Sequence, residues 1–437
     1  MTTPIYQKPV ELLQNLIRFD TTNPPGNEKA IIMYLKEIIE AAGLKTTIIA
    51  KDENRPNLIA RLPGRGEAPP LLLYGHVDVV TTVGQQWTHP PFEGNIEDGM
   101  IWGRGTLDMK GGVAMMVSAF LRAHEKGEKP AGDIILAIVP DEEVDGSHGA
   151  RFLTENHAEL FEGVKYAIGE GGGLTIRMGG EKFYTVMVAE KQICSMRATV
   201  RGPAGHGSMP RRGGATAKLA KMLDKLENKR LPVHVTEVSD KMLSTIAGAL
   251  SFPTNVGIKM LLNPAFSDRM LDALGDQGLL INPLLHNTVS PNIIRGGNKI
   301  NVIPAEISVD LDGRLLPQFT PDEMLAELGA LLGDDVELEV THYDKGAGKP
   351  DLTMYPLLAD ILKKADPSGT PIPMLLSGVT DGRFFSRIGI QTYGYLPMDI
   401  PGELIDTIHA ANERVPVEAM EFGTNAISEV LRRFGDN

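Results

Sequence analysis

Leu71-Leu-Leu-Tyr-Gly-His-Val-Asp78 is an apolar run that leads directly into two side chains able to bind protons or metal ions. Its first four residues have no polar break, which predicts a short buried strand. A second run of the same kind is Ile134–Val139. Apolar residues at helical spacing lie on either side of these runs, as in 29–42 and 111–125. Short apolar strands that alternate with helices predict an α/β layered domain with a largely buried sheet.

The middle of the chain has a different pattern. Strands are predicted at 183–188, 194–200, 306–311 and 336–341, the first two with one solvent-facing side. A mostly helical stretch covers 233–288, and from about Tyr355 the α/β pattern resumes. We therefore expect an α/β domain in two parts, 1–180 and 346–437, with an inserted α+β domain at 181–345.

Composition sets limits on the partners of the protein. The 437 residues suggest two or three domains, and 43 basic against 56 acidic residues give a net charge of −13. An acidic surface repels phosphate groups, which argues against nucleic acid or an anionic membrane as the main partner. One cysteine, Cys194, makes no internal disulfide, and its alternating strand predicts that it is buried and inert. Without a basic and apolar leader pattern, the expected location is the cytoplasm.

Acidic and histidine side chains recur just after the predicted strands, where open α/β sheets bind their ligands. These residues are His76, Asp78, Asp108, Glu142, Glu143, Glu170 and His409. A pair of divalent cations needs a bridging carboxylate and further nitrogen and oxygen ligands, and a free carboxylate must take the proton of the attacking water. Either Glu142 or Glu143 could be that base. Asp78, two residues after His76, would accept the other imidazole N–H.

Simpler interpretations apply to each of these residues alone. A single histidine after a strand is more often a hydrogen-bonded core residue than a ligand, and Asp108 in a glycine-rich loop is most often a turn residue. The same loop, 103–112, does not fit a nucleotide-binding motif, because no P-loop pattern is present and position 108 is Asp where the dinucleotide motif needs Gly. The joint pattern of strand-end residues is much more specific than any one of them.

At this point the chain resembles the M20 metallopeptidases, the group that contains aminoacylases, glutamate-type carboxypeptidases, acetylornithine deacetylase and succinyl-diaminopimelate desuccinylase. The motifs that carry the resemblance run through most of the chain in family order. They are Tyr74-Gly-His76-Val-Asp78, Gly103-Arg-Gly-Thr-Leu-Asp108, Asp141-Glu142-Glu143, Gly202-Pro-Ala-Gly-His206, Asn301-Val-Ile-Pro, Asp312-Gly-Arg314, Gly378-Val-Thr-Asp381-Gly-Arg383 and His409.

The resemblance implies a role for each matching residue. His76 and Glu170 would hold one zinc ion, Glu143 and His409 the other, and Asp108 would bridge the two. Cobalt or manganese would also suit such ligands. Glu142 would be the general base and then the general acid, and Asp78 would support His76. The remaining implied residues are His206, which would stabilise the oxyanion in a partner's active site, and Arg314, Asn301, Gly378 and Thr380, which would contact substrate.

The resemblance also implies a fold and an activity. The fold would be a three-layer α/β/α catalytic domain with an inserted α+β lid that forms a homodimer, here lengthened by the helical stretch near 240–287. The expected reaction is hydrolysis of an amide or peptide bond beside a free carboxylate, in an N-acyl amino acid or a short peptide. A binuclear aminopeptidase and a catalytically silent binding relative are the alternatives. His206 and Arg314 favour the carboxylate-reading branch over the aminopeptidase.

Overall fold

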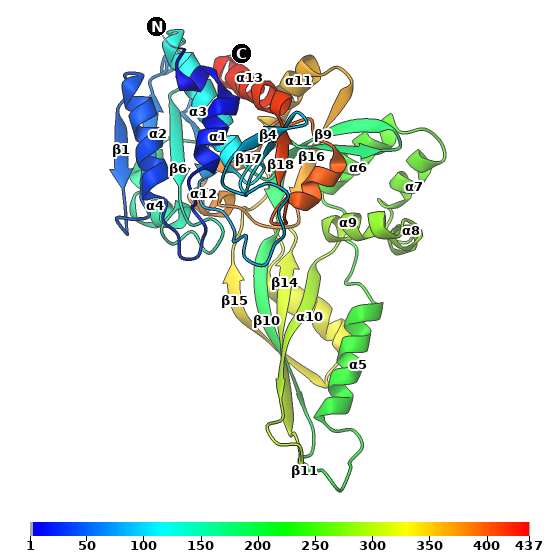
Figure 1. Ribbon diagram of the computed structural model, residues 1–437. Coiled ribbons are helices and arrows are strands. Elements are labelled where there is room, and N and C mark those ends of the chain that lie inside the picture. The colour runs from blue at the N-terminus through cyan, green and yellow to red at the C-terminus, as the bar shows by residue number, and fades with distance from the viewer. Residues whose placement is uncertain (1–2, 437) are drawn as a thin grey trace. The chain divides into compact units, whose positions relative to one another are not determined.

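The computed structural model describes residues 3–436 and divides into two compact units (Figure 1). Unit 1 is built from residues up to Val188, from Pro350–Met374 and from Thr380 onward, and unit 2 from Ala189–Lys349 and Leu375–Val379. Within residues 3–436, no helix is long and apolar enough to cross a membrane.

A nine-stranded sheet forms the centre of unit 1. Its order is β1 (Thr46–Ile49), β2 (Asn57–Leu62), β6 (Ile134–Val139), β3 (Leu71–His76), β7 (Tyr166–Gly169), β17 (Gln391–Gly394), β9 (Glu181–Glu190) and β16 (Gly369–Leu376), with β8 (Thr175–Met178) also paired to β9. The central pairs β6–β3, β3–β7 and β7–β17 are parallel. Every residue of β3 and β6 is buried, as the two apolar runs predict.

Helices cover both faces of this sheet. On one face α3 (Lys110–Glu125) packs on β3 and β6 and is itself flanked by α1 (Pro9–Ile17) and α13 (Val417–Arg433). The other face packs against α4 (Ala150–Asn156) and α12 (Gly382–Arg387), which share a core with Tyr74 and Ile135. At the margins lie α2 (Lys29–Ala41), packed on β1 and β2, and α11 (Tyr355–Ala365), packed on α13. The unit is therefore a three-layer α/β/α structure.

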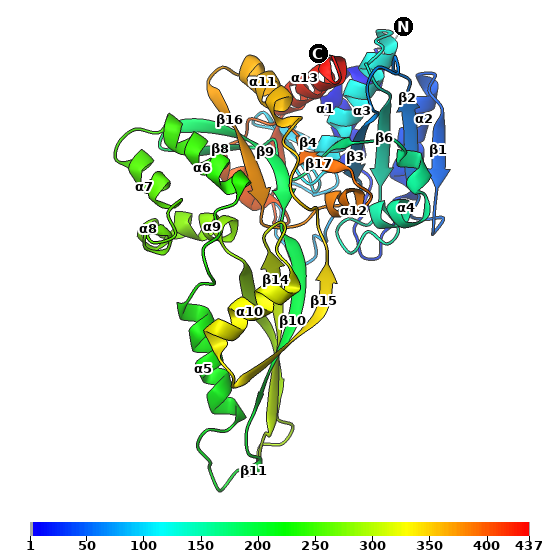
Figure 2. The same ribbon diagram turned by 180° about the vertical axis from the view of Figure 1, so that it is seen from behind.

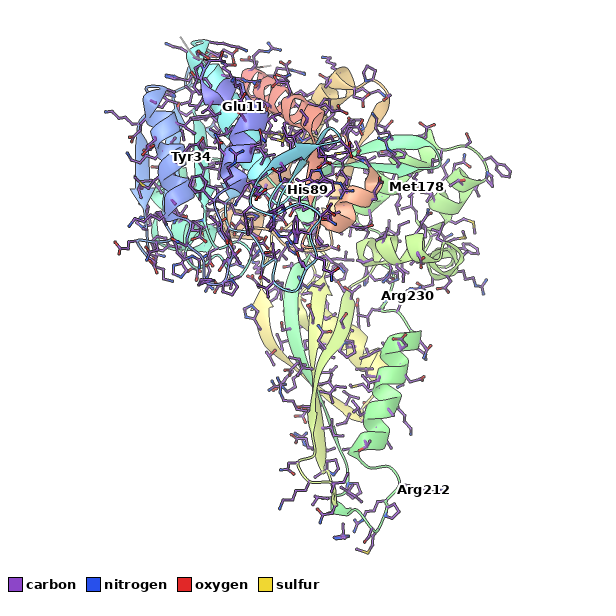
Figure 3. The ribbon with its side chains drawn as sticks, in the orientation of Figure 1. Glu11, Tyr34, His89, Met178, Arg212 and Arg230 are labelled. Atoms are coloured by element: carbon purple, nitrogen blue, oxygen red, sulfur yellow. The ribbon has the colours of Figure 1, made fainter. Side chains whose placement is uncertain are left out.

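A small sheet joins two distant parts of the chain in unit 1. Its strands are β18 (Arg414–Pro416), β5 (Met100–Trp102) and β4 (Asn95–Glu97), all antiparallel. His89, labelled in Figure 3, packs on Trp102 with ring centroids 4.6 Å apart. Short 3-10 helices within residues 3–436 are η1 (Ile5–Gln7), η2 (Ala158–Phe161) and η3 (Gly402–Thr407). The β18–β5 pairing brings the loop before Asp108 beside the loop that carries His409.

Unit 2 has an α+β structure of its own (Figure 2). Four antiparallel strands run in the order β12 (Thr288–Gly296), β14 (Glu306–Leu315), β10 (Gln192–Arg201) and β15 (Val336–Asp344). The core of the unit lies between this sheet and the helices α5 (Ala215–Asn228) and α10 (Pro321–Leu332). The helical stretch contains α6 (Glu237–Ala249), α7 (Thr254–Met260), α8 (Ser267–Ala273) and α9 (Asp276–Leu285). A short ribbon pairs β11 (Gly205–His206) with β13 (Val302–Ile303).

Two strand predictions have different outcomes. β10 alternates buried and half-buried residues, and Cys194 on it is fully buried, so the predicted alternation and the predicted burial of Cys194 are confirmed. β9 does not have the predicted solvent-facing side, because every residue from Phe183 to Glu190 is buried. On one of its faces the Tyr184 ring stacks on Phe422 of α13, with ring centroids 5.8 Å apart, a contact that the residue pattern of β9 alone does not reveal.

Candidate metal centre

Three parallel strands bring the first group of polar residues to one edge of the large sheet. β3 ends on His76, β6 is followed by Glu142 and Glu143, and β7 is followed by Glu170. These strands are neighbours in the order β6, β3, β7, so their carboxyl ends meet. This is the edge at which open parallel sheets bind ligands.

Two loops supply the remaining residues. Asp108 lies between β5 and α3, and His409 lies between η3 and β18. His409 has a φ of +62°, a conformation that few non-glycine residues adopt without support from their surroundings. Because β18 pairs with β5, these two loops reach the sheet edge together.

The distances define two groups of three residues that share Asp108. His76 Nε2 is 3.1 Å from Asp108 Oδ1 and 3.5 Å from Glu170 Oε2. His409 Nε2 is 3.0 Å from Asp108 Oδ2 and 3.2 Å from Glu143 Oε2. In each group the donor atoms all lie within 4.8 Å of one another. The structure thus brings together the five residues that the sequence predicts as metal ligands.

The donor chemistry fits two divalent cations. Each group offers one imidazole nitrogen and carboxylate oxygens, a combination that binds zinc, cobalt or manganese. Among the described residues, Oε1 of Glu143 and Oε1 of Glu170 are buried without a hydrogen-bond partner. Buried carboxylates gathered this closely repel one another and carry a large desolvation cost unless positive charge lies between them.

The pKa values of the two histidines follow from the same crowding. Burial opposes protonation of His76, but the carboxylates of Glu170, Asp108 and Asp78 outweigh it and raise the pKa well above its usual value. Hydrogen bonds to Asp108 and then Glu143 raise the pKa of His409 to about 10. Metal ligation requires neutral imidazoles, so ions would displace these protons.

Glu142 and Glu143 are neighbours with different surroundings. Glu143 belongs to the His409 group, whereas Glu142 belongs to neither group. Burial, and then the charge of Glu170, raise the pKa of Glu142 well above its usual value. Of the two candidates for the base, Glu142 is the one whose carboxylate the donor groups do not use.

Asp78 has more contacts than the expected one with His76. The closest partner of His76 Nδ1 is the Asp78 main-chain carbonyl at 3.0 Å, and the carboxylate lies at 3.4 Å. The carboxylate also accepts the backbone N–H groups of Glu142 and Glu143, each at 3.2 Å, and the Asn23 side-chain amide at 2.9 Å. Asp78 therefore fixes the loop that carries the candidate base.

The predicted substrate-contacting residues are distributed over both units. In unit 2, His206 is exposed, with Nδ1 2.7 Å from Ser208 Oγ, and the β11–β13 pairing places it beside Asn301. Arg212, labelled in Figure 3, marks the loop after this ribbon. Arg314 lies near the opposite end of β14, half-buried and paired with Asp312 at 2.8 Å. The structure therefore brings His206 to Asn301 but not to Arg314.

Gly378 and Thr380 lie in the segment before α12. Gly378 belongs to the short second segment of unit 2, and Thr380 to unit 1. Thr380 is buried, and its Oγ1 accepts the Gly382 backbone N–H at 3.0 Å. In the structure this hydroxyl helps to begin α12.

Sequence reasoning missed several buried polar residues around the centre. Glu413, four residues after His409, is fully buried and paired with Arg104 at 2.6 Å. Asn23 joins Asp78 to Asp141, with its amide nitrogen 3.0 Å from Asp141 Oδ1. An acid so soon after a predicted ligand was the available signal for Glu413. Nothing in the local pattern of Asn23 points to the centre.

The α/β/α fold, together with two histidine–carboxylate groups joined by one aspartate, defines a class of proteins, the hydrolases that bind a pair of metal ions. The chain belongs to peptidase family M20/M25/M40, whose family model matches residues 72–433. It is therefore a metal-binding hydrolase of amide or peptide bonds. The predicted family and fold class are confirmed.

Relatives of several kinds share this fold. The succinyl-diaminopimelate desuccinylase of Alkalilimnicola ehrlichii is 30% identical over 385 residues, which cover 86% of both chains. The N-fatty-acyl-amino acid synthase/hydrolase of Xenopus tropicalis is 29% identical over 363 residues, 80% of this chain and 70% of the relative. An M20 family metallo-carboxypeptidase structure from Sulfolobus solfataricus matches with a TM-score of 0.67 and 17% identity, covering 98% of this chain and 99% of that chain.

Proposed function

We propose that this hydrolase uses two zinc ions to cleave the amide bond of an N-acyl amino acid or short peptide with a free carboxylate. The observation that carries the proposal is the pair of donor groups joined by Asp108, with Glu142 beside them but outside both. His76 and Glu170 would hold one ion, and Glu143 and His409 the other. When bound, the ions would acidify a water molecule and polarise the scissile carbonyl.

Glu142 moves the proton in this proposal. Its carboxylate takes a proton from the attacking water and returns it to the leaving amine, which is the role of a general base and then a general acid. Burial, and then the charge of Glu170, raise the pKa of Glu142, and this direction supports the second role because it favours a carboxyl that holds the proton it has taken. Asp78 keeps Glu142 in place through the backbone N–H at 3.2 Å.

The substrate carboxylate would be read by Arg314, while Asn301 would contact substrate together with the neighbouring His206. Gly378 and Thr380 would also contact substrate. Asp312 holds the half-buried Arg314 guanidinium through Nε at 2.8 Å and Nη2 at 3.1 Å, so Nη1 and the outer N–H of Nη2 are the groups that would donate to a carboxylate. His206 would stabilise the oxyanion in the partner subunit, for which its exposed position is suitable.

Unit 2 would form a homodimer. β12 is an outer strand of its four-stranded sheet, and Ile293 and Ile294 on it are about half exposed, at 48% and 53%. An exposed apolar edge strand is a template for pairing with another chain. We expect light scattering after gel filtration to give twice the chain mass, and Ile294→Lys to lower it. A monomer in both cases would contradict the dimer.

The substrate class is tested with a panel of amides. Metal-loaded protein is incubated with N-succinyl, N-acetyl and long-chain N-acyl amino acids and with dipeptides, and amine release is measured with and without chelator. The N-succinyl and long-chain N-acyl types correspond to the names of two of the relatives described above. We expect turnover of at least one type, lost on chelation and restored by zinc. No turnover with two ions bound per chain would favour the silent binding relative, and preference for substrates lacking a carboxylate would favour an aminopeptidase.

A further inference from the structure

Glu413 and Arg104 form a buried ion pair that the proposed reaction does not use. Glu413 is 0% exposed and Arg104 1%, and Arg104 Nη1 lies 2.6 Å from Glu413 Oε2. Removing two charges from water is costly, and their mutual attraction often does no more than offset that cost. The stability of the fold alone is therefore a weak explanation for this pair.

The Glu413 carboxylate is the centre around which the loop to Asp108 is wrapped. Its Oε2 accepts the Gly105 backbone N–H at 3.0 Å. Its Oε1 accepts those of Leu107 at 2.8 Å and Asp108 at 3.2 Å. Gly105 has a φ of +89°, and an added Cβ would lie 2.9 Å from Val79, so only glycine suits this turn. Three backbone donors on one carboxylate fix the position from which the Asp108 side chain extends.

The Arg104 side chain holds the other loop. Its Nη2 donates to the Ala410 carbonyl at 3.0 Å and to Gln85 Oε1 at 2.9 Å. Gln85 Nε2 in turn donates to the His409 carbonyl at 2.9 Å. Trp87 covers this guanidinium, with its ring centroid 5.2 Å from Arg104 Cζ. The backbone carbonyls of His409 and Ala410 are thus both hydrogen-bonded to this network.

We propose that Glu413 and Arg104 are positioning residues that set the separation of Asp108 and His409 for the metal ions. Glu413 acts on the Asp108 backbone, and Arg104, partly through Gln85, acts on the His409 backbone. The ion pair between them makes the two loops one rigid frame, which holds His409 in its unusual backbone conformation. This inference rests on the proposed metal-dependent function, and it assigns to the pair a role in ion affinity and not only in folding.

The test is a Co²⁺ titration of metal-free full-length protein, followed by the visible absorption of the bound ion. In Glu413→Gln the buried Arg104 loses its counter-charge and the loop loses an acceptor. Outer residues that orient metal ligands typically change affinity by about 10–100-fold. We expect Co²⁺ affinity to fall by that range and the absorption bands to shift. The backbone amides of residues 105–108 should exchange hydrogen faster than they do in the wild type. The value of kcat should fall by a much larger factor than KM rises.

Glu421→Gln is the matched control. Glu421 forms a two-bonded pair with Arg122 between α13 and α3, with distances of 2.7 and 3.0 Å. Loss of that pair affects packing but not the ligand loops, so Co²⁺ affinity and spectrum should remain those of the wild type. If Glu413→Gln binds Co²⁺ within twofold of wild type with an unchanged spectrum, the positioning role is wrong.

Gln85→Met keeps the inference testable if Glu413→Gln does not fold. Gln85 is only half-buried, and methionine keeps its length while losing the bond to the His409 carbonyl. We expect one of the two Co²⁺ ions to bind more weakly and the other to be unaffected. Gln14→Met is its control, because Gln14 also donates to a loop carbonyl, that of Gly94. Equal Co²⁺ affinity in Gln85→Met and Gln14→Met would overturn the role of Arg104 and Gln85. A wild-type protein that does not bind two ions would instead overturn the proposed function.

Discussion

Glu142 and Glu143 show how adjacent residues of the same type acquire different roles. The Glu143 carboxylate faces His409, whereas Glu142 lies outside both donor groups. We predict that Glu142→Gln lowers kcat by about 10²–10⁴-fold, the usual contribution of a general base, with two ions still bound. Glu143→Gln should instead lose one ion. Turnover and metal content of both variants check this, and near-normal turnover in Glu142→Gln would contradict the assignment.

Lys191 in unit 2 gives a prediction about pH. It is fully buried, with Nζ donating to the His286 carbonyl at 2.8 Å and to Thr288 Oγ1 at 3.0 Å. Burial, and then the charge of Arg314, lower its pKa from 10.5 to about 7. The unfolded chain therefore binds more protons than the folded chain between pH 7 and 10.5, so this residue makes the unfolding free energy rise with pH in that window.

Lys191→Met removes this contribution. We expect the unfolding free energy of the wild type to rise relative to Lys191→Met by on the order of 2 kcal/mol between pH 7 and pH 9.5. Below pH 7 the difference between the two proteins should stay constant, which serves as the internal control. Urea unfolding of both proteins at each pH measures the difference in unfolding free energy. If the wild type became less stable relative to Lys191→Met as the pH rises, the predicted direction would be wrong.

At the scale of elements, α3 and α13 approach closely because α13 has a glycine at the contact. A Cβ at Gly423 would overlap Met115 Sδ and lie 2.6 Å from the Pro397 carbonyl, which cannot move as a side chain can. We predict that Gly423→Ala lowers the unfolding free energy by about 1–3 kcal/mol through overpacking. Gly329→Ala in α10 is the control, since nothing lies within 4 Å of its Cβ position. Helix propensity should then raise stability by about 0.5–1 kcal/mol, as thermal unfolding would show.

At the scale of the whole molecule, the metal ions link binding to stability. Without them, the buried carboxylates at the sheet edge repel one another, and ions that bind only the folded state stabilise it by mass action. We expect chelation to lower Tm by several degrees and zinc to restore it. Glu142→Gln should respond to chelation as the wild type does, because it retains both ligand groups. An unchanged Tm after confirmed metal removal would contradict this linkage.

Much of this molecule was predictable from local pattern. The buried strands β3 and β6 and the helices α2 and α3 follow from apolar runs and helical spacing. Residue type near strand ends predicted a polar cluster that contains the five candidate metal ligands, and the resemblance to the M20 family separated Glu143 from Glu142. The burial of β9 did not follow, because the residues of a strand cannot show that a distant helix, here α13, packs on one of its faces.

The sequence by itself determined the layered fold and a cluster of candidate donor residues, because periodicity and residue chemistry are local properties. Its motifs, through their resemblance to the M20 family, supplied the family and the assignment of the donors. Only the tertiary structure decided which side chains fix the loops that carry the donor residues. It showed that Asp78 accepts the backbone N–H of Glu142, that Glu413 accepts that of Asp108, and that Arg104 donates to the carbonyl next to His409. These contacts join residues up to about three hundred positions apart, and desolvation makes each one matter only after the chain has closed around it.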